Sequence, residues 1–261
     1  REAGLDTLPG TAAEVLHDEV RNKLCPDKLN SAQWLEVMEA AHTAGFKTTA
    51  TIMYGHIDEP RHWASHLMRI RELQQRSGGF TEFVPLPFVH MEAPMYRKGK
   101  SRKGPSFRET ILMHAVSRLV FHGFIDNIQA SWVKMGEAGI KVCLNAGVND
   151  LGGTLMNESI TRAAGTRHGQ EWTPNIMESQ IRAAGRLPRM RDTLYRDVST
   201  ERYQTSFADS ELSVVRNLKA GKYQTSKRLS DIESQPISVL YGSGETSSTV
   251  APQVTLMAAC N

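Results

Sequence analysis

The sequence predicts an α/β protein, and more narrowly a partial (β/α) barrel of the TIM type. Short apolar runs alternate with longer helical patterns over roughly the first 196 residues, an order that produces parallel strands joined by right-handed crossovers. Unusual polar residues follow several of these runs, as in barrels, where loops at the C-terminal ends of the strands carry the chemistry. No G-x-G-x-x-G pattern follows any run, which disfavours an open dinucleotide-binding sheet.

The first predicted elements are a short apolar run over residues 5–8 and a helix over residues 12–24. Thr11 would cap this helix, with Glu14 completing a capping box. The same helix start could instead bind an anion through its free N–H groups. A second helix, over about residues 30–44, is predicted by a further capping box and ends at a glycine.

The middle of the chain continues the alternation. β-Branched residues predict a strand over residues 47–53. Asp58 is positioned to cap the next helix, which should end at Gly78. A third strand is predicted over residues 83–86, and Ser106 is expected to cap the helix after it.

Two further strands are predicted, over residues 125–130 and, as a short fifth strand, within residues 142–148. The polar run 149–154 that follows is expected to open into a helix. A last helix is predicted over residues 174–184, because a proline suits its first position. These elements amount to about five β/α units, which is the second half of a barrel.

The sequence divides into a barrel portion, residues 1–196, and a C-terminal extension, residues 197–261. About one-quarter of the extension is Ser or Thr, a composition that rarely buries enough apolar surface to fold alone. We expect a flexible tail there, with a short helix possible over residues 210–218.

Composition narrows the function classes. The net charge of +3 is small for 261 residues and argues against nucleic acid as a partner. The basic run 97–103 is broken by Gly and Ser and is predicted to be a solvated loop. No apolar stretch reaches the length of a membrane span. Three widely spaced cysteines, Cys25, Cys143 and Cys260, form no disulfide framework or metal motif and favour a reducing compartment, the cytoplasm or an organelle stroma.

The strand end near residue 54 is the first candidate for a ligand site. The backbone at Ile52 and Met53 could lie against a flat ligand ring, with Tyr54 and His56 directed inward. A buried strand with a hydrogen-bonded, structural His56 is the alternative.

Polar residues around residues 129–134 form a second candidate. Trp132 could stack on a ring, Gln129 could bind an amide edge through its paired donor and acceptor, and Ser131 lies between them. The alternative is that Trp132 is a buried core residue.

The third candidate surrounds Gly152 and Gly153. Asn149, Asp150 and Thr154 flank these glycines, which suit a turn with positive φ or a close backbone approach. Asp150 could be a base, a ribose ligand or a turn-stabilising side chain.

Six segments, taken in order, resemble the FO synthase family of radical S-adenosylmethionine enzymes. The resemblance is to the part of that family that acts on L-tyrosine, either subunit 2 or the matching half of the fused enzyme. The matching segments are residues 8–14, 50–56, 78–80, 129–134, 149–154 and 191–195. Each segment alone is weak evidence, but their order and spacing make the set specific.

The resemblance implies a radical reaction on a barrel. In that family a [4Fe-4S] cluster cleaves S-adenosyl-L-methionine, and the 5′-deoxyadenosyl radical abstracts hydrogen from L-tyrosine. The tyrosine Cα–Cβ bond then breaks, and the 4-hydroxybenzyl group joins 5-amino-6-(D-ribitylamino)uracil in the synthesis of the deazaflavin FO, the chromophore of coenzyme F420. Such chemistry needs a cavity that excludes water.

The resemblance also implies roles for individual residues. The expected catalytic residues are Tyr54, His56, Gln129 and Asp150. The expected cofactor-binding residues are Thr11, Glu14, Arg21, Ile52 and Met53. The expected substrate-binding residues are Ser131, Trp132, Asn149 and Thr154.

The sequence departs from the family in one respect, because it contains no C-x-x-x-C-x-x-C cluster motif. The first residue is Arg1 rather than Met, and we expect the cluster ligands, together with the first three barrel strands, to lie outside this chain. The chain alone should then bind no metal cluster and have no activity. The subunit 1 half of FO synthase is an expected partner. Two alternatives stay open: an enzyme of the aminofutalosine synthase type in menaquinone synthesis, and a non-catalytic half-barrel remnant.

Overall fold

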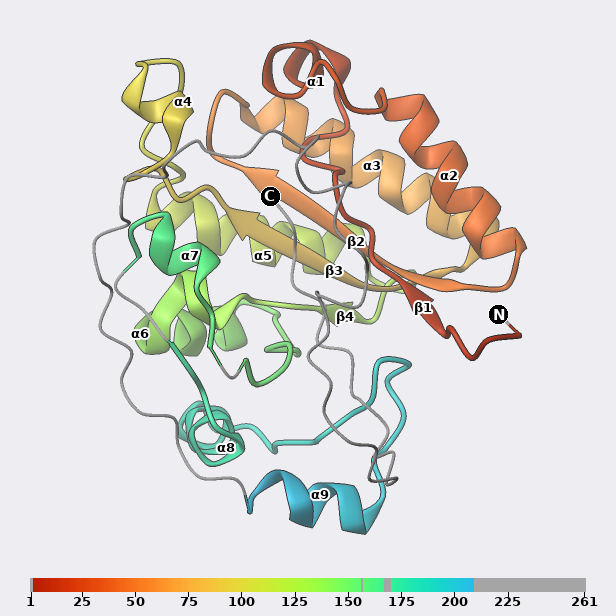
Figure 1. Ribbon diagram of the computed structural model, residues 1–261, viewed down its shortest axis with the longest axis vertical. Helices are drawn as coiled ribbons and strands as arrows, with labels where there is room; N and C mark the ends of the chain where they lie inside the picture. The colour runs from red at the N-terminus through yellow and green to blue at the C-terminus, as the bar shows by residue number, and fades with distance from the viewer. Residues whose placement is uncertain (1, 156, 167–169, 209–261) are drawn as a thin grey trace, which may run out of the picture. The chain divides into compact units, whose positions relative to one another are not determined.

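A computed structural model describes residues 2–155, 157–166 and 170–208, and it contains a parallel sheet with helices packed against it (Figure 1). The strands pair in the order β1-β2-β3-β4, and all three pairings are parallel. The α/β class and the parallel sheet are therefore confirmed. Closure into a barrel is not seen, because the four strands found in the described residues form an open row. The strands are β1 (Thr7–Leu8), β2 (Lys47–Tyr54), β3 (Phe80–Pro87) and β4 (Asn127–Ile128).

The helices fill the intervals between the strands and continue after β4. The capping boxes predicted for α2 and α5 are present, and Thr173 caps α8. The helices are α1 (Asp18–Leu24), α2 (Ser31–Thr43), α3 (Pro60–Ser77), α4 (Pro94–Arg97), α5 (Phe107–Val120), α6 (Trp132–Asn145), α7 (Ile160–Ala163), α8 (Pro174–Ala183) and α9 (Thr200–Ser206).

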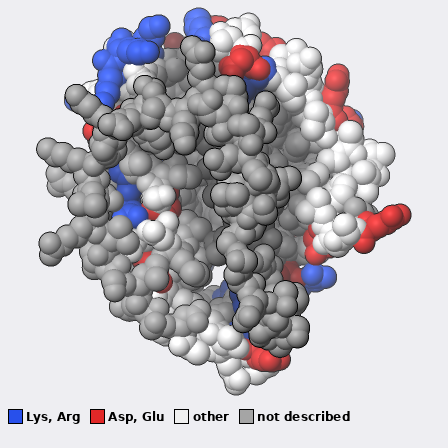
Figure 2. Space-filling model, viewed as in Figure 1, with Lys and Arg blue, Asp and Glu red and all other residues white. Residues whose placement is uncertain are grey.

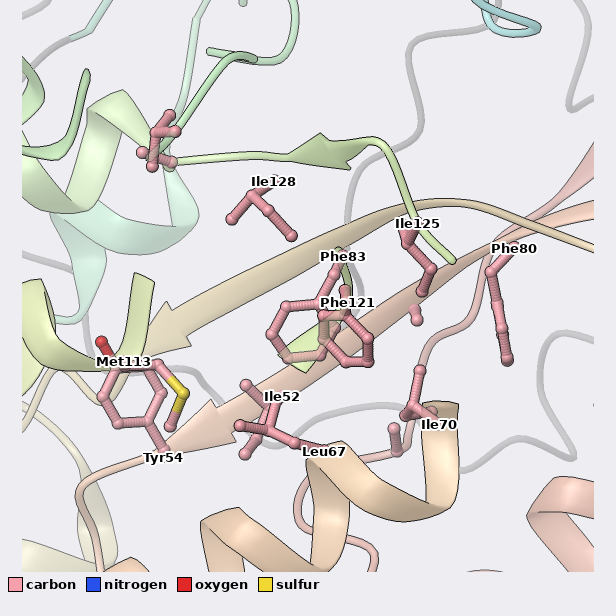
Figure 3. Packing of buried hydrophobic residues seen from close by; sticks show 14 of the residues in the cluster. Ile52, Tyr54, Leu67, Ile70, Phe80, Phe83, Met113, Phe121, Ile125 and Ile128 are labelled. Carbon is pink, nitrogen blue, oxygen red and sulfur yellow. The ribbon is translucent and has the colours of Figure 1, made fainter. Parts of the chain in front are cut away.

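The two faces of the sheet differ in burial. On β2, Ala50, Ile52 and Tyr54 are fully buried, whereas the alternate residues Thr51 and Met53 are only partly buried. Side chains alternate between faces along a strand, so the first set faces the helices. Figure 3 shows Ile52 and Tyr54 among side chains of α3 and α5 in this core. The opposite face is left for polar groups.

The predicted helix over residues 12–24 is wrong over residues 12–17, because α1 begins only at Asp18. Ala12 and Glu14 have positive φ values of 60° and 43°, which no right-handed helix allows. Thr11 therefore caps no helix, and the predicted Thr11–Glu14 capping box does not form. The reason is tertiary: Ala13 is fully buried, and the loop is held by a side chain from α1, described below.

Asp58 does not cap α3, contrary to the prediction. The N-terminal cap is Glu59, whose N–H donates to Nδ1 of His62 at 3.0 Å. Asp58 instead accepts hydrogen bonds from the N–H groups of Gly55 and His56, both at 2.8 Å. The carboxylate thus stabilises the turn after β2.

The predicted fifth strand within residues 142–148 is also wrong, because this region is the end of α6 and a turn. Ile140, Cys143 and Leu144 are buried at helical spacing, so a helix buries this apolar run better than a strand. The parallel strand position is instead occupied by a single bridge between Gln129 and Asp150. The helix expected directly after residues 149–154 is absent, since α7 begins at Ile160.

The predicted boundary near residue 196 is followed by α9, in which the Tyr203 hydroxyl donates to Glu178 of α8 at 2.6 Å. The helix considered over residues 210–218 lies outside the described residues, and the division into 1–196 and 197–261 stays a prediction. Among the described helices, none is both long and apolar enough to cross a membrane.

The basic run 97–103 lies at α4 and the loop after it. Figure 2 shows Lys and Arg side chains gathered at the upper left, where Figure 1 places α4. Acidic neighbours satisfy two of them: Arg102 binds Glu109 at 2.8 Å and Arg97 binds Glu92. This local pairing agrees with the interpretation of a solvated loop.

Candidate active site

The end of β1 is fixed to β2 through Gly10. The Gly10 N–H donates to Oγ1 of Thr49 at 2.8 Å, and Oγ1 of Thr51 donates to the Gly10 carbonyl at 2.8 Å. A Cβ atom at Gly10 would lie 1.8 Å from the Thr49 carbonyl oxygen, so only glycine fits. Thr11 follows as an exposed residue, and its carbonyl accepts the Trp34 indole N–H at 2.9 Å.

Arg21 and Glu14 hold the loop that follows β1. The Arg21 side chain is buried, with 2% exposed, and its guanidinium donates to the carbonyls of Ala13 and Leu29. The Glu14 carboxylate pairs with Lys28 at 2.9 Å, while its carbonyl accepts the Met53 N–H at 2.9 Å. The two side chains thus position the loop against the end of β2.

Tyr54 lies on the helix side of β2 rather than on its open face, and His56 lies in the turn just after the strand. Tyr54 is fully buried, and its ring meets the Trp63 ring edge to face with centroids 5.5 Å apart. Figure 3 shows this ring beside Met113 of α5. Burial raises the pKa of Tyr54 well above its usual range, so the phenol stays neutral.

His56 and Asp58 form a buried pair, with 2.9 Å between His56 Nδ1 and an Asp58 carboxylate oxygen. Burial acts to raise the pKa of Asp58, but hydrogen bonds from His56, Gly55 and Trp63 outweigh it and hold the pKa well below its usual range. The Asp58 carboxylate is therefore charged at neutral pH and orders the turn at the end of β2.

The open face of the sheet carries a set of polar residues that we call the Arg191 cluster: Glu82, Gln129, Asp150, Arg191 and Tyr195. Asp150 is its centre. One carboxylate oxygen accepts the Gly152 N–H at 2.6 Å and the Gln129 amide at 3.4 Å. The other forms an ion pair with Arg191 at 2.7 Å. The Arg191 guanidinium also lies over the Tyr195 ring, 3.9 Å from its centroid.

The charges of the Arg191 cluster are strongly coupled by burial. Burial raises the pKa of Glu82, and the positive charge of Arg191 opposes this rise. Burial acts to lower the pKa of Arg191, but the electrostatic effect of Asp150, Tyr195 and Glu82 is larger. The pKa of Arg191 is therefore raised. The Tyr195 hydroxyl is buried without a hydrogen bond of good geometry, and its backbone has a φ of 62°. A non-glycine residue with positive φ stores strain, which is common at functional sites.

The remaining predicted residues border this face. Trp132 is a core residue that stacks on Trp172 with centroids 5.1 Å apart and donates to the Gly153 carbonyl at 3.1 Å. Ser131 begins α6 without a side-chain capping bond. Thr154 is partly buried just beyond this turn.

Asn149 fastens the segment before Asp150 to β4. Its side-chain oxygen accepts the Ile128 N–H at 2.9 Å and an N–H of Arg118 at 2.6 Å. Its amide N–H groups donate to the Asp126 carbonyl at 3.1 Å and to the Asn127 side-chain oxygen at 3.4 Å, so all four hydrogen bonds hold Asn149 to the protein itself.

The structure thus brings together Gln129 and Asp150 but not all the predicted residues. Tyr54 and Ile52 lie on the opposite face, while Arg21 and Glu14 bind the loop after β1. Sequence reasoning assigned no role to Glu82, Arg191 or Tyr195. A signal for Glu82 existed, because it is a lone carboxylate inside the apolar run 80–87.

The described residues do not fit a [4Fe-4S] cluster. Cys25 and Cys143, the described cysteines, belong to separate helical regions and are buried, with 6% and 0% exposed. Burial raises the pKa of both thiols, that of Cys143 to about 12, whereas cluster ligands are thiolates.

A grouping of metal-type side chains does occur on α1 and α3, where ligand atoms of His17, Glu19 and His62 lie within 4.8 Å of one another. Sequence spacing could not show it, since His62 is distant in the chain. Glu19 already pairs with Arg61 at 3.1 Å.

One known protein family is similar to part of this chain. Residues 77–203 match the family model described as the CofH/MqnC C-terminal region. This part of the chain is thus similar to a CofH/MqnC C-terminal region. The CofH match includes β3, β4 and the whole of the Arg191 cluster.

Relatives of this chain match it over about three-quarters of its length. It is 52% identical over 198 residues to the 5-amino-6-(D-ribitylamino)uracil–L-tyrosine 4-hydroxyphenyl transferase of Methanopyrus kandleri, covering 76% of the chain and 54% of that relative. The same-named protein of Methanothermobacter thermautotrophicus is 50% identical over 198 residues, with the same two coverages. The FO synthase of Mycobacterium tuberculosis is 51% identical over 195 residues, covering 75% of the chain and 23% of that protein. The chain therefore spans about half the length of the archaeal relatives it matches.

Proposed function

We propose that this chain is the C-terminal part of a radical S-adenosylmethionine transferase. The proposed reaction joins the 4-hydroxybenzyl group of L-tyrosine to 5-amino-6-(D-ribitylamino)uracil in the synthesis of FO. The observation that carries the proposal is the identity of about one-half to relatives named as the tyrosine 4-hydroxyphenyl transferase and FO synthase. These names support this function over an aminofutalosine synthase-type reaction.

The proposed substrate site is the open face of the sheet, at the C-terminal ends of its parallel strands. Ligands of (β/α) enzymes bind at that edge, because loops there present side chains from a rigid sheet. Gln129 and Asp150 occupy this position, and the Gln129 amide can pair with a uracil ring edge as both donor and acceptor. The ion pair with Arg191 would hold the Asp150 carboxylate in place for the substrate.

We propose that the residues on the other side of β2 stabilise the site and do not contact the substrates. Tyr54, His56 and Asp58 stabilise the turn after β2, and the loop held by Glu14 and Arg21 lies against it. Together they would keep the backbone at Ile52 and Met53 in place for the adenine of S-adenosylmethionine. Thr11, Ser131, Trp132, Asn149 and Thr154 are proposed to border the same ligands.

S-Adenosylmethionine and a [4Fe-4S] cluster would supply the radical chemistry. We propose that the cluster ligands come from the part of the relatives that this chain does not span, together with the remaining strands of a barrel. The matched stretch is 54% of the archaeal transferase but 23% of FO synthase, so the latter is a much longer polypeptide. This difference supports the subunit 1 half as the partner activity.

The test is product analysis with the full-length protein that contains this chain. Under reducing, anaerobic conditions with S-adenosylmethionine, L-tyrosine and 5-amino-6-(D-ribitylamino)uracil, mass spectrometry should detect the tyrosine-derived adduct of the uracil. Absence of this adduct, with turnover of a different acceptor, would refute the proposal. Failure to form any product with an intact cluster would favour the non-catalytic remnant.

Variants test the site separately. Gln129→Ala should lower turnover by about fivefold or more, since it removes a paired hydrogen-bonding group worth about 1 kcal/mol or more. Gln75→Ala is the matched control, because Gln75 is exposed on α3. Unchanged turnover of the Gln129 variant would remove this residue from the site.

A further inference from the structure

We propose that the cavity beyond the end of β3 is the L-tyrosine site and that Lys134 binds the carboxylate of the amino acid. The inference rests on the proposed function and deepens it, because nothing in the family comparison assigns a residue to either end of this substrate.

The cavity has a volume of about 640 Å³ and lies where ligands of parallel α/β proteins bind, outside the C-terminal end of a strand. It is bounded by the loop after β3, the start of α5, the first turn of α6 and the segment after α7. The Glu92 N–H donates to the Ala164 carbonyl at 3.1 Å, so the β3 loop and α7 are joined at the cavity wall.

The walls are suited to an aromatic side chain. Phe88, Met91, Phe107 and Met135 line the cavity. Phe107 is 57% exposed, which is unusual for a phenylalanine and leaves its ring available at the cavity wall. Aromatic and thioether groups make favourable contacts with a ring in such a site.

Lys134 provides the charge that an amino-acid ligand requires. It lines the cavity and is only partly exposed, and within the described part of the chain it forms no ion pair. Burial lowers the pKa of Lys134 to about 8, and the negative charge of Glu158 partly opposes this shift. An unpaired, partly buried ammonium is costly, and a ligand carboxylate would remove that cost.

The surroundings of Lys134 leave its charge available. Glu158 is the carboxylate whose charge acts on Lys134. One of its oxygens accepts the Thr161 N–H at 2.8 Å and the other is buried without a hydrogen-bond partner, but among the described residues Glu158 forms no ion pair with Lys134. His90 is the other titratable group that lines the cavity. The Thr166 hydroxyl also lines the cavity and is buried without a described partner, so it is free to bind the ligand amino group.

The ligand class is therefore an amino acid with an aromatic side chain. The ribityl-uracil carries no carboxylate and so offers Lys134 hydrogen-bond acceptors but no ion pair. S-Adenosylmethionine does carry an amino-acid group, but its sulfonium would place a positive charge in a cavity that already holds a lysine. We therefore assign the cavity to L-tyrosine, and S-adenosylmethionine becomes an arm of the test.

The first experiment measures the reactivity of individual lysines in the 261-residue chain. Trinitrobenzenesulfonate is added in limiting amount near neutral pH, and the labelled lysines are located by mass spectrometry. At ten times its dissociation constant, L-tyrosine should slow labelling of Lys134 about tenfold, by mass action. Tyramine, which lacks the carboxylate, should protect far less. Lys141, exposed on the same helix, should react equally in all samples.

The second experiment measures affinity by calorimetry. Lys134→Met should weaken L-tyrosine binding by about tenfold to a hundredfold, the usual worth of a hydrogen bond to a charged group. Lys134→Arg should restore much of the affinity, whereas tyramine binding and the control Lys141→Met should be unaffected.

Three results would overturn the assignment: no protection of Lys134 by L-tyrosine, equal protection by tyramine, or protection by S-adenosylmethionine instead. These outcomes are distinct from a failure of the proposed function. Product formation without protection would leave the function intact and remove this site. Protection without the tyrosine-derived product would leave an aromatic amino-acid site and refute the function.

Discussion

Gly10 lies where the end of β1 touches β2, and the space available to it is set by the Thr49 carbonyl. Gly10→Ala places a Cβ atom 1.8 Å from that oxygen, so the two strands must separate. The variant should lose about 2 kcal/mol of unfolding free energy, the usual cost of overpacking, as measured by urea denaturation. Gly153→Ala is the control, because a Cβ atom there meets nothing within 4 Å. Equal stability of the two variants would show that the β1 end is not held as described.

The ion pair between Asp150 and Arg191 is a second place where stability depends on single residues. The Asp150 side chain is 6% exposed and that of Arg191 is 23% exposed, so removing one charge leaves the other poorly solvated. Asp150→Asn should lower the unfolding free energy by about 3 kcal/mol, as measured by urea denaturation. The matched control is Asp197→Asn, in the pair with Arg189, where both side chains are mostly exposed. That change should leave the unfolding free energy nearly unchanged, and similar losses in both variants would contradict the burial of the Arg191 cluster.

At the scale of elements, His42 joins three parts of the fold. It lies near the end of α2, and its two ring nitrogens contact Ser77 Oγ at 2.6 Å and Thr48 Oγ1 at 2.7 Å. A Cβ atom at Gly79 would lie 2.1 Å from the His42 ring, so the glycine that follows the end of α3 also makes room for this junction. The ring is therefore enclosed by α2, the end of α3 and the start of β2.

This junction predicts a pH dependence of stability. Burial lowers the pKa of His42 from 6.5 to about 4, so the folded state binds fewer protons than the unfolded state between these values. Stability is then fully present above pH 6.5 and falls as the pH drops toward 4, by up to about 1.4 kcal/mol per pH unit from this residue. Urea denaturation at several pH values should show this slope reduced in His42→Gln. His122→Gln, at an exposed position, should keep the wild-type slope, and an unchanged slope in His42→Gln would contradict its neutral, buried state.

At the scale of the whole molecule, the cysteines of this chain do not provide the cluster ligands that the proposed activity requires. The described cysteines are buried thiols, and the chain holds three in all at wide spacing. Anaerobic reconstitution of the 261-residue chain with iron and sulfide should therefore give no stable cluster absorbance, and Cys143→Ser should not change this result. The full-length protein, treated identically, is the positive control. A stable cluster on the chain alone would contradict the proposal that its ligands lie elsewhere.

Local sequence signals were enough to predict the alternation of strands and helices and the boundaries of several elements. The capping boxes of α2 and α5, the Pro174 start of α8 and strands β2 and β3 were predictable, because caps, prolines and β-branched runs act over a few residues. The family was also predictable, since six short segments occur in a specific order. Gln129 and Asp150 were identified as candidate residues because each is a polar residue that follows a short apolar run.

Which residues share a face depends on packing between elements that are far apart in the chain. The loop over residues 12–16 departs from helix because Arg21 holds its carbonyls and Ala13 is buried, and neither contact has a sequence signal. The predicted fifth strand became the end of α6 because Ile140 and Cys143 pack into the core at helical spacing. Tyr54 and Gln129 look equivalent in sequence, as polar residues at strand ends. The side-chain alternation of the paired strands places Tyr54 among the helices and Gln129 beside Asp150 and Arg191.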